Sequence, residues 1–563
     1  MASFSLLPAE LAESIASQLA QSDLYALSRV NRSLNTLVTP YLYRHVDLTI
    51  SPGDKMPRID RFCINILDDR RRATRVETLR LGPSSKEGVK EGQRWLPQDK
   101  RFDDVAMYEK AIAALSDETL ITSGDYLKDA IVQREYSAYA TLIVLILPAL
   151  KQLDVADFSY SSMDRLNIVF RDLDSGRAWN QRQASPALLE RLSCIKTATC
   201  NVDKSTGLPY PDDKGRIWLD QILNLPSLEK LEFSITDTQA ELSRSRFAHG
   251  GLAHGPSRLL VSQVRTTSIT NLVIRHSTPC ALSVRPLLAC TPQLRSFTWD
   301  FAYDCHDREE APERWIDLDA WNESLNAVKT SLQVLVFAAE YFDSGKYAFE
   351  QPKIGSRLFG FLDLTSFECL HTVEVPIPFV TGDVEFSITS DIYPLFPPNL
   401  RHLSLRLDLS LAQLSYQLDT SILPQGLTLQ QSQAEARCAM NARMDLSYAY
   451  HAMLALIDHA PRLESISVWQ PGDPTLSWFD GQITDFAITC GNKSVIGSLL
   501  FPMLLRWRKA EHRDLIKEVR FDSLNLSVSP LEYLHRSERA AIPLGLASQF
   551  HLLALRSHLV RKR

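Results

Sequence analysis

A short alternation of apolar and polar residues recurs along most of this chain. It reads Pro-x-Leu-x-x-Φ-x-Φ, where Φ is apolar, and the copies that begin with proline are PALKQLDV (148–155), PSLEKLEF (226–233), PQLRSFTW (292–299), PNLRHLSL (398–405) and PRLESISV (461–468). Because neighbouring side chains of a strand point to opposite faces, each copy predicts a short strand with two side chains inward and one outward. The recurrence indicates an internal repeat.

Looser copies without the proline lie between these. They are VETLRL at Val76, ITNLVI at Ile269, LQVLVF at Leu332, LHTVEV at Leu370 and IKEVRF at Ile516. Most copies follow a leucine-rich helical stretch, for example Leu142 to Leu147, Leu219 to Leu225 and Met453 to His459. Helix, turn and strand in this order predict an α/β solenoid.

The steps between copies are uneven, from 25 residues between positions 269 and 294 to 78 residues between 150 and 228. The predicted solenoid is therefore irregular. We interpret its long polar insertions as loops: Gly82 to Arg101, Asp174 to Arg216, Gln239 to Arg258, Asp304 to Asp319 and Leu427 to Arg443. Long loops on a rigid scaffold either bind partners or are disordered segments without a binding role, and both interpretations stay open.

Near the N-terminus the apolar period changes from two to four, at Leu7, Leu11, Ile15 and Leu19. This stripe predicts a helix from about Pro8 to Ala20. Two further helices are predicted, one with Ser22 as its N-cap and one that Pro40 ends, and they carry Leu24, Leu27, Val30, Leu34, Leu37 and Val38. So small a unit cannot bury all these residues, so some must pack on the rest of the chain or on a partner.

The order of these residues resembles an F-box, in the divergent form common in fungal F-box proteins. The matching positions are Leu7-Pro8-x-Glu10, Ile15, Leu19, Asp23-Leu24, Leu27, Val30 and Pro40-x-Leu42-Tyr43-Arg44-x-Val46. Ala16 stands where many members have an aromatic residue, and Leu34 where many have tryptophan. The resemblance implies docking onto a Skp-family adaptor, which binds a cullin scaffold in a ubiquitin ligase of the SCF type. It implies apolar adaptor contacts from Leu7, Pro8, Leu11, Ile15, Leu24, Leu27 and Val30.

The repeated phrase resembles the leucine-rich repeat, although the asparagine or cysteine that usually follows the strand is absent. An F-box followed by such repeats is a known combination. We therefore expect an F-box domain in residues 1–50, a linker helix in 51–75, an irregular leucine-rich-repeat-like horseshoe in 76–535 and a cap or tail in 536–563. The residue between the two apolar anchors of each strand is expected on the open, concave face and forms the candidate substrate surface: Asp154, Glu232, Thr298, Val336, Glu374, Ser404 and Ser467. An ordinary solvated sheet face remains the alternative.

Charge and composition narrow the class of protein. The net charge is −6 and the basic runs are short, which argues against nucleic acid as a partner. The most apolar run, Ala138 to Leu150, is too short to span a bilayer and contains Pro148, so no membrane partner is expected. The nine cysteines include no CxxC pair, and we interpret them as reduced, mostly buried thiols. The first residues lack a basic signal-peptide region, and we expect the protein in the cytoplasm, the nucleus or both.

The common catalytic motifs are absent from the sequence. There is no P-loop, no GxGxxG, no GxSxG and no HExxH. Asp304-Cys305-His306-Asp307 could not converge on one metal ion from a strand, His249 and His254 are interpreted as solvated, and Cys194 and Cys200 as buried thiols without a catalytic role. We expect no enzyme activity, no cofactor and no metal.

Together these observations predict the substrate-recognition subunit of an SCF-type ubiquitin ligase. Its F-box would hold the adaptor, and its repeats would hold a protein substrate that the sequence does not identify. The alternative is a scaffold of the same construction that assembles partners outside any ligase.

Overall fold

The computed structural model describes residues 8–50, 56–82, 96, 104–117, 124–155, 165–166, 190, 192–200, 222–223, 225–233, 267–277, 281–304, 316–342, 358–382, 392–410, 429–470, 478–504 and 516–522. The chain divides into two compact units. Unit 1 comprises Met1–Ser234 with Gln263–Ile269, and unit 2 comprises Ile235–Ser262 with Thr270–Arg563.

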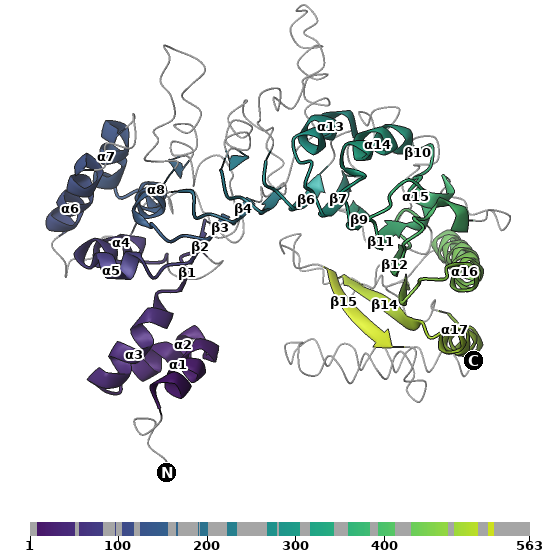
Figure 1. Cartoon of the computed structure of the whole chain (residues 1–563), viewed down its shortest axis with the longest axis horizontal. Coiled ribbons are helices and arrows are strands. Elements are labelled where there is room, and N and C mark those ends of the chain that lie inside the picture. Colours follow the sequence, from purple (N-terminus) through teal and green to yellow (C-terminus); the bar gives the residue numbers. More distant parts are fainter. Residues whose placement is uncertain are drawn as a thin grey trace, which may run out of the picture. The chain divides into compact units, whose positions relative to one another are not determined.

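Unit 1 begins with three short helices, α1 (Ala9–Gln18), α2 (Gln21–Ser28) and α3 (Arg32–Leu42) (Figure 1). Their shared core consists of Ala16, Leu24 and Val38. The three predicted helices are confirmed, but two of their boundaries are wrong. Ala20 takes the N-cap position of α2 in place of Ser22, and Pro40 lies inside α3. Pro40 is two residues from the helix end, where its missing N–H removes a single backbone hydrogen bond.

In the described residues, the sheet of unit 1 has five parallel strands in sequence order. They are β1 (His45–Asp47), β2 (Thr78–Leu81), β3 (Gln152–Val155), β4 (Thr197–Cys200) and β5 (Lys230–Phe233). The helices described beside them are α4 (Ile59–Asp68), α5 (Arg70–Ala73), α6 (Asp104–Asp117), α7 (Gly124–Val132) and α8 (Tyr136–Ile146). The strand β1 lies within the predicted F-box segment 1–50, so that segment also supplies the first strand of the sheet. The predicted linker 51–75 holds both α4 and α5.

The most apolar run of the chain forms α8. Its residues Tyr136 to Leu145 are all buried, which explains why this helix has no polar side. The buried Tyr136 hydroxyl donates a hydrogen bond to the Leu48 carbonyl at 2.7 Å and accepts one from the Gly82 N–H at 3.1 Å. The hydroxyl thereby joins the chain segments that follow β1 and β2, and burial raises the pKa of Tyr136 far above its usual range.

The Tyr136→Phe variant should lower the free energy of unfolding of unit 1 by about 1–3 kcal/mol, because it leaves two buried backbone groups without this hydroxyl. Urea unfolding followed by circular dichroism measures the loss. Tyr25→Phe is the control, since Tyr25 is exposed on α2, and it should leave stability unchanged. Equal stability of Tyr136→Phe and the native chain would contradict the structural role of the hydroxyl.

Within the part of unit 2 that the structure describes, the sheet has seven parallel strands and one antiparallel strand. The parallel strands are β6 (Asn271–Ser277), β7 (Ser296–Asp304), β9 (Val334–Phe342), β11 (Thr372–Pro376), β12 (His402–Arg406), β13 (Ser465–Trp469) and β14 (Ile496–Leu504). The last strand, β15 (Ile516–Asp522), pairs with β14 in the antiparallel sense. Two short strands, β8 (Ile316–Asp317) and β10 (Leu358–Phe359), pair separately.

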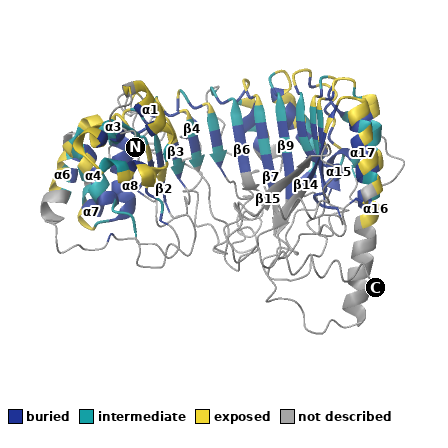
Figure 2. Ribbon diagram, turned by 90° about the horizontal axis from the view of Figure 1, so that it is seen from below, coloured by how far each residue is buried: buried dark blue, intermediate teal, exposed yellow. Residues whose placement is uncertain are grey.

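Helices cover one side of the unit 2 strands (Figure 1). They are α13 (Ala281–Ala289), α14 (Leu318–Leu325) with the 3-10 turn η5 (Asn326–Val328), α15 (Ile377–Thr381), η7 (Tyr393–Leu395), α16 (Leu429–His459) and α17 (Asp480–Asn492). The inward strand residues pack against them and are buried (Figure 2). Aromatic rings make up much of this core, and Trp321 of α14 lies edge-to-face with Trp299 of β7, their ring centroids 4.8 Å apart.

Every copy of the repeated phrase contains a strand, so the predicted strands and the mixed α/β class with its parallel sheet are confirmed. Five of the described strands match no copy of the phrase, namely β1, β4, β8, β10 and β14. In β4 the anchors are the small residues Ala198 and Cys200, and in β14 Gly497 stands opposite the anchor Ile466 of β13. Small residues weaken the alternation by which a strand is recognised.

Three predicted insertions are wrong in part. Asp174 to Arg216 contains the strand β4, and Asp304 to Asp319 contains β8 and the start of α14. The segment Leu427 to Arg443 was interpreted as a loop, but from Leu429 onward it belongs to the 31-residue helix α16. Its glutamines, alanines and arginines are strong helix formers, and the prediction gave weight to their polarity alone. Most of the remaining predicted loops, and the predicted cap or tail 536–563, lie outside the described residues.

No helix in the described part of the chain has the length and apolar character needed to cross a membrane.

Candidate functional site

Two residues of the predicted apolar stripe of α1, Leu11 and Ile15, face away from the core of the three helices, whereas Leu19 packs against that core. Ala12 and Ala16 are buried, while Leu11 is 53% exposed and Ile15 39% exposed. Alanine lets a helix approach its neighbours closely, so α1 packs through its small residues and presents its large ones outward. A soluble domain that exposes adjacent large apolar side chains usually offers them to a partner.

The other predicted adaptor residues fall into three groups. Pro8 is exposed at the N-cap of α1, and Val30, just after α2, is 65% exposed. Leu27 is half-buried against the core, and Leu24 is a core residue, so the side chain of Leu24 is not part of the exposed set. Leu7 lies outside the described residues. Tyr25, which the sequence comparison did not single out, is exposed on α2 with the Arg29 guanidinium 5.7 Å from its ring centroid.

The three helices connect directly to the sheet of unit 1. Tyr43, at the C-cap of α3, stacks on Phe62 of α4 with ring centroids 6.2 Å apart. The guanidinium group of Arg72, on α5, lies 5.6 Å from the centroid of the Tyr43 ring. The Arg44 carbonyl accepts hydrogen bonds from the N–H groups of Glu77 and Thr78, both at 3.0 Å. The step from the helices into β1 is therefore held by packing and by backbone hydrogen bonds.

The residues between the strand anchors form a row in each unit. We call the sheet face that carries them, opposite the buried anchors, the open face. In unit 1, the strand register places five of them side by side in the order Asp47, Arg80, Asp154, Thr199 and Glu232. In unit 2, it does the same for Thr298, Val336, Glu374, Ser404, Ser467 and Ser498. All the predicted substrate residues thus lie in these rows, and their binding role stays a prediction.

The open face of unit 1 is charged and internally paired. Arg80 donates to Asp47 at 2.8 Å and to Asp154 at 3.1 Å. Although partial burial lowers the pKa of Arg80, the two carboxylates outweigh it and raise the pKa above its usual value. Glu77 stands 3.3 Å from both Arg44 and Lys151, and these cations hold its pKa below the usual value against the opposing effect of burial.

The open face of unit 2 carries many hydroxyl groups. Along its rows lie the half-buried hydroxyl residues Ser296, Thr298, Thr372, Ser404, Ser465 and Ser467. The carboxylate of Glu374 accepts a hydrogen bond from Arg406 Nη1 at 2.6 Å, so this charge is compensated within the face. The two units therefore offer a partner different chemistry.

Arg406 is the centre of a buried network at the end of β12. Its Nε donates to Asp408 Oδ2 at 2.6 Å, and its guanidinium carbon lies 4.3 Å from the ring centroid of Trp469 on β13. The pairing of β9 with β11 ends at Val336 and Glu374, and beyond it Asp408 Oδ2 accepts the N–H of Ala339 on β9 at 2.8 Å. Asp408 thus connects β12 to β9 past the end of β11.

In the described residues, the metal-capable side chains and the cysteines are not arranged as a metal site or a reactive site would require. Among them, no three histidine, cysteine or acidic side chains gather as a metal site would require. Asp304 ends β7, and positions 305–307 lie outside the described residues, as do His249 and His254. Cys63 and Cys490 are buried, Cys290 is half-buried, and Cys194 and Cys369 are exposed, so the prediction of mostly buried thiols is wrong for the last two. The side chain of Cys200 is not described.

Comparison of the sequence with curated proteins finds no match. Comparison with protein families finds the F-box-like family at residues 4–49, the span of α1, α2, α3 and β1. The N-terminal helices, with their outward leucine and isoleucine, therefore form an F-box-like domain.

Proposed function

We propose that this chain is the substrate-recognition subunit of an SCF-type ubiquitin ligase. The F-box-like domain at residues 4–49 is the observation that carries the proposal, because F-box domains typically bind a Skp-family adaptor. The outward position of Leu11 and Ile15 supports it, since these side chains are free to enter an apolar groove on the adaptor. The cullin then joins through the adaptor.

The sheets of the two units serve as the substrate holder, a leucine-rich-repeat-like scaffold in this proposal. Their parallel strands present rows of side chains in register, which is how an array of repeats offers a continuous binding surface. The chain's contribution to ubiquitin transfer is the positioning of the substrate, with no reactive group of its own. The protein works in the cytoplasm, the nucleus or both.

Tagged full-length protein should co-purify with both the adaptor and the cullin. Recovery of both supports the ligase subunit. Recovery of the adaptor without the cullin would favour a scaffold outside the ligase, and recovery of neither would contradict the function altogether. Each complex should be recovered from cross-linked and from untreated cells, so that weak association with the cullin is not missed.

A further inference from the structure

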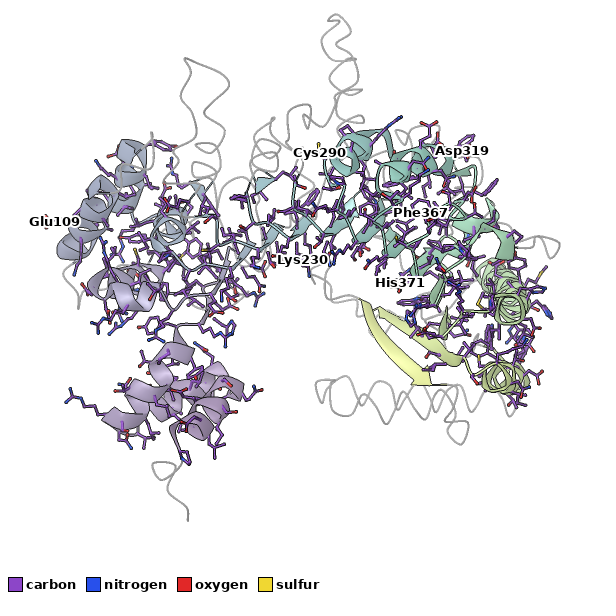
Figure 3. All side chains as sticks on the ribbon, viewed as in Figure 1. Glu109, Lys230, Cys290, Asp319, Phe367 and His371 are labelled. Carbon is purple, nitrogen blue, oxygen red and sulfur yellow. The ribbon has the colours of Figure 1, made fainter. Side chains whose placement is uncertain are left out.

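Two histidines and an arginine lie together at one edge of the open face of unit 2. His371 precedes β11, Arg401 precedes β12, and His402 begins β12. Backbone hydrogen bonds align this edge, since the Arg401 N–H donates to the His371 carbonyl at 2.8 Å and the Glu464 N–H to the Arg401 carbonyl at 2.7 Å. His371 lies on the side of the strands opposite the helices α13 and α14 (Figure 3). We call His371, Arg401 and His402 the basic edge.

A carboxylate of the chain already contacts the basic edge. Glu464 Oε1 lies 3.4 Å from Arg401 Nη1, and Glu464 Oε2 lies 3.8 Å from His402 Nε2. Both Arg401 and Glu464 are more than half exposed, so this pair contributes little to stability and its members can exchange partners. The geometry thus shows that a carboxylate can lie within ion-pair distance of Arg401 and His402, and that the carboxylate of Glu464 is held there weakly.

The charge of the basic edge depends on pH. The imidazole rings of His371 and His402 have centroids 6.5 Å apart. His371 is surrounded by uncharged Gln333 on the β9 side, by Arg401 and His402 on the β12 side and by Glu464 beyond them. Burial, then His402 and Arg401, lower the pKa of His371, and Glu464 opposes them. With a neutral His371 imidazole the charges of Arg401 and Glu464 cancel, and protonation of His371 adds a positive charge to the edge.

Beside the basic edge lie hydroxyl groups that can bind an extended chain. His402 Nδ1 is 2.9 Å from Ser465 Oγ, and His371 Nδ1 is 2.9 Å from Thr372 Oγ1. The next row along the strands holds Ser404 and Ser467. The same row holds Glu374, whose charge is compensated by Arg406. A ligand that pairs with the edge therefore meets mainly hydroxyl groups where it continues over β12 and β13.

We propose that the basic edge and the adjoining hydroxyl rows bind a carboxylate-rich peptide segment of the substrate, and bind it more tightly as the imidazole of His371 becomes protonated. The inference rests on the proposed function in one respect, that the segment belongs to the ligase substrate. Charge complementarity selects acidic over basic segments. Because an anionic ligand stabilises the charged imidazole, binding takes up protons, and affinity rises as pH falls through the range where histidine titrates.

The direct test measures fluorescence anisotropy of labelled ten-residue peptides with the purified full-length protein. The probes are an alternating Glu–Ser peptide, a Lys–Ser peptide and a Gln–Ser peptide. The Glu–Ser peptide should bind best, and its affinity should rise roughly tenfold between pH 7.5 and pH 5.5, where glutamate remains ionised. Equal binding of the three peptides, or an affinity independent of pH, would overturn the proposal.

Variants distinguish this edge from the rest of the surface. Arg401→Gln should weaken binding of the Glu–Ser peptide roughly fivefold, and the double variant His371→Gln, His402→Gln should remove the pH dependence. Glu464→Gln should strengthen binding at pH 7.5, because it removes the competing carboxylate. A loss of affinity in Glu464→Gln would argue against the site, since a merely structural role predicts that direction.

The control is Arg285→Gln. Arg285 pairs with Glu323 at 3.2 Å across α13 and α14, and both are more than half exposed, as at the basic edge. This variant should leave peptide binding unchanged. None of these measurements involves the adaptor, so a failure here leaves the proposed ligase function standing, and loss of adaptor capture leaves this site standing.

Discussion

The double variant Leu11→Asp, Ile15→Asp is expected to lose capture of the Skp-family adaptor by a factor of about one hundred or more, while its thermal unfolding stays that of the native chain. The two side chains lie on the outward side of α1, so their replacement removes apolar contact area and places two charges against an apolar groove. The core of the three helices is formed by Ala16, Leu24 and Val38 and is not altered. Surface plasmon resonance with purified adaptor measures the loss.

Ser17→Asp is the matched control for this result. Ser17 is exposed on α1 but lies on another side of the helix from Leu11 and Ile15, because each residue turns the helix by about 100°. It should bind the adaptor as the native chain does. If the double variant still binds with native affinity, α1 is not the adaptor contact, and the exposed residues of α2, Tyr25 with the neighbouring Val30, become the surface to test.

The second large effect is expected in unit 2. Asp408→Ala should lower the free energy of unfolding of this unit by about 3–5 kcal/mol, because it removes one of the two carboxylates that compensate the buried Arg406 and the acceptor of the Ala339 N–H. Urea unfolding followed by tryptophan fluorescence is a suitable measurement, since Trp469 lies directly against Arg406.

The exposed pair Arg285 and Glu323 supplies the comparison for Asp408→Ala. Glu323→Ala breaks an ion pair in which both side chains are more than half exposed to solvent. It should change the free energy of unfolding by less than about 1 kcal/mol. If Asp408→Ala proves as mild as Glu323→Ala, the network is not what holds β12 to β9.

The strands were predictable because their signal is local. Two anchors separated by one residue, such as Leu403 and Leu405, mark a strand wherever one face is buried, and the structure buries both. The same local signal also placed Ser404 and Ser467 in one row, since equivalent positions of parallel strands fall in register. The pattern of apolar residues does not indicate whether a strand runs parallel or antiparallel to its neighbour. The copy at Ile516 was read as one more repeat, whereas β15 runs antiparallel to β14.

The candidate site was predictable in part. The stripe of Leu11 and Ile15 was evident, but whether it faced a core or a partner depended on what the rest of the domain buries. The buried positions are Ala12 and Ala16, which a search for large apolar residues passes over. The histidines of the basic edge gave no sequence signal, because His371 and Arg401 are thirty residues apart and meet only through strand pairing.

The hairpin of β14 and β15 also bears on the order in which unit 2 folds. Its strands are separated by residues 505–515 alone, whereas each parallel pair must first close a longer crossover. Local contacts form faster than distant ones, so the hairpin is a natural early structure of this unit. The hairpin is also the last described part of the chain to be synthesised. We therefore expect the sheet of unit 2 to be completed late in translation, with its earlier strands unpaired at this edge until β14 and β15 have been made.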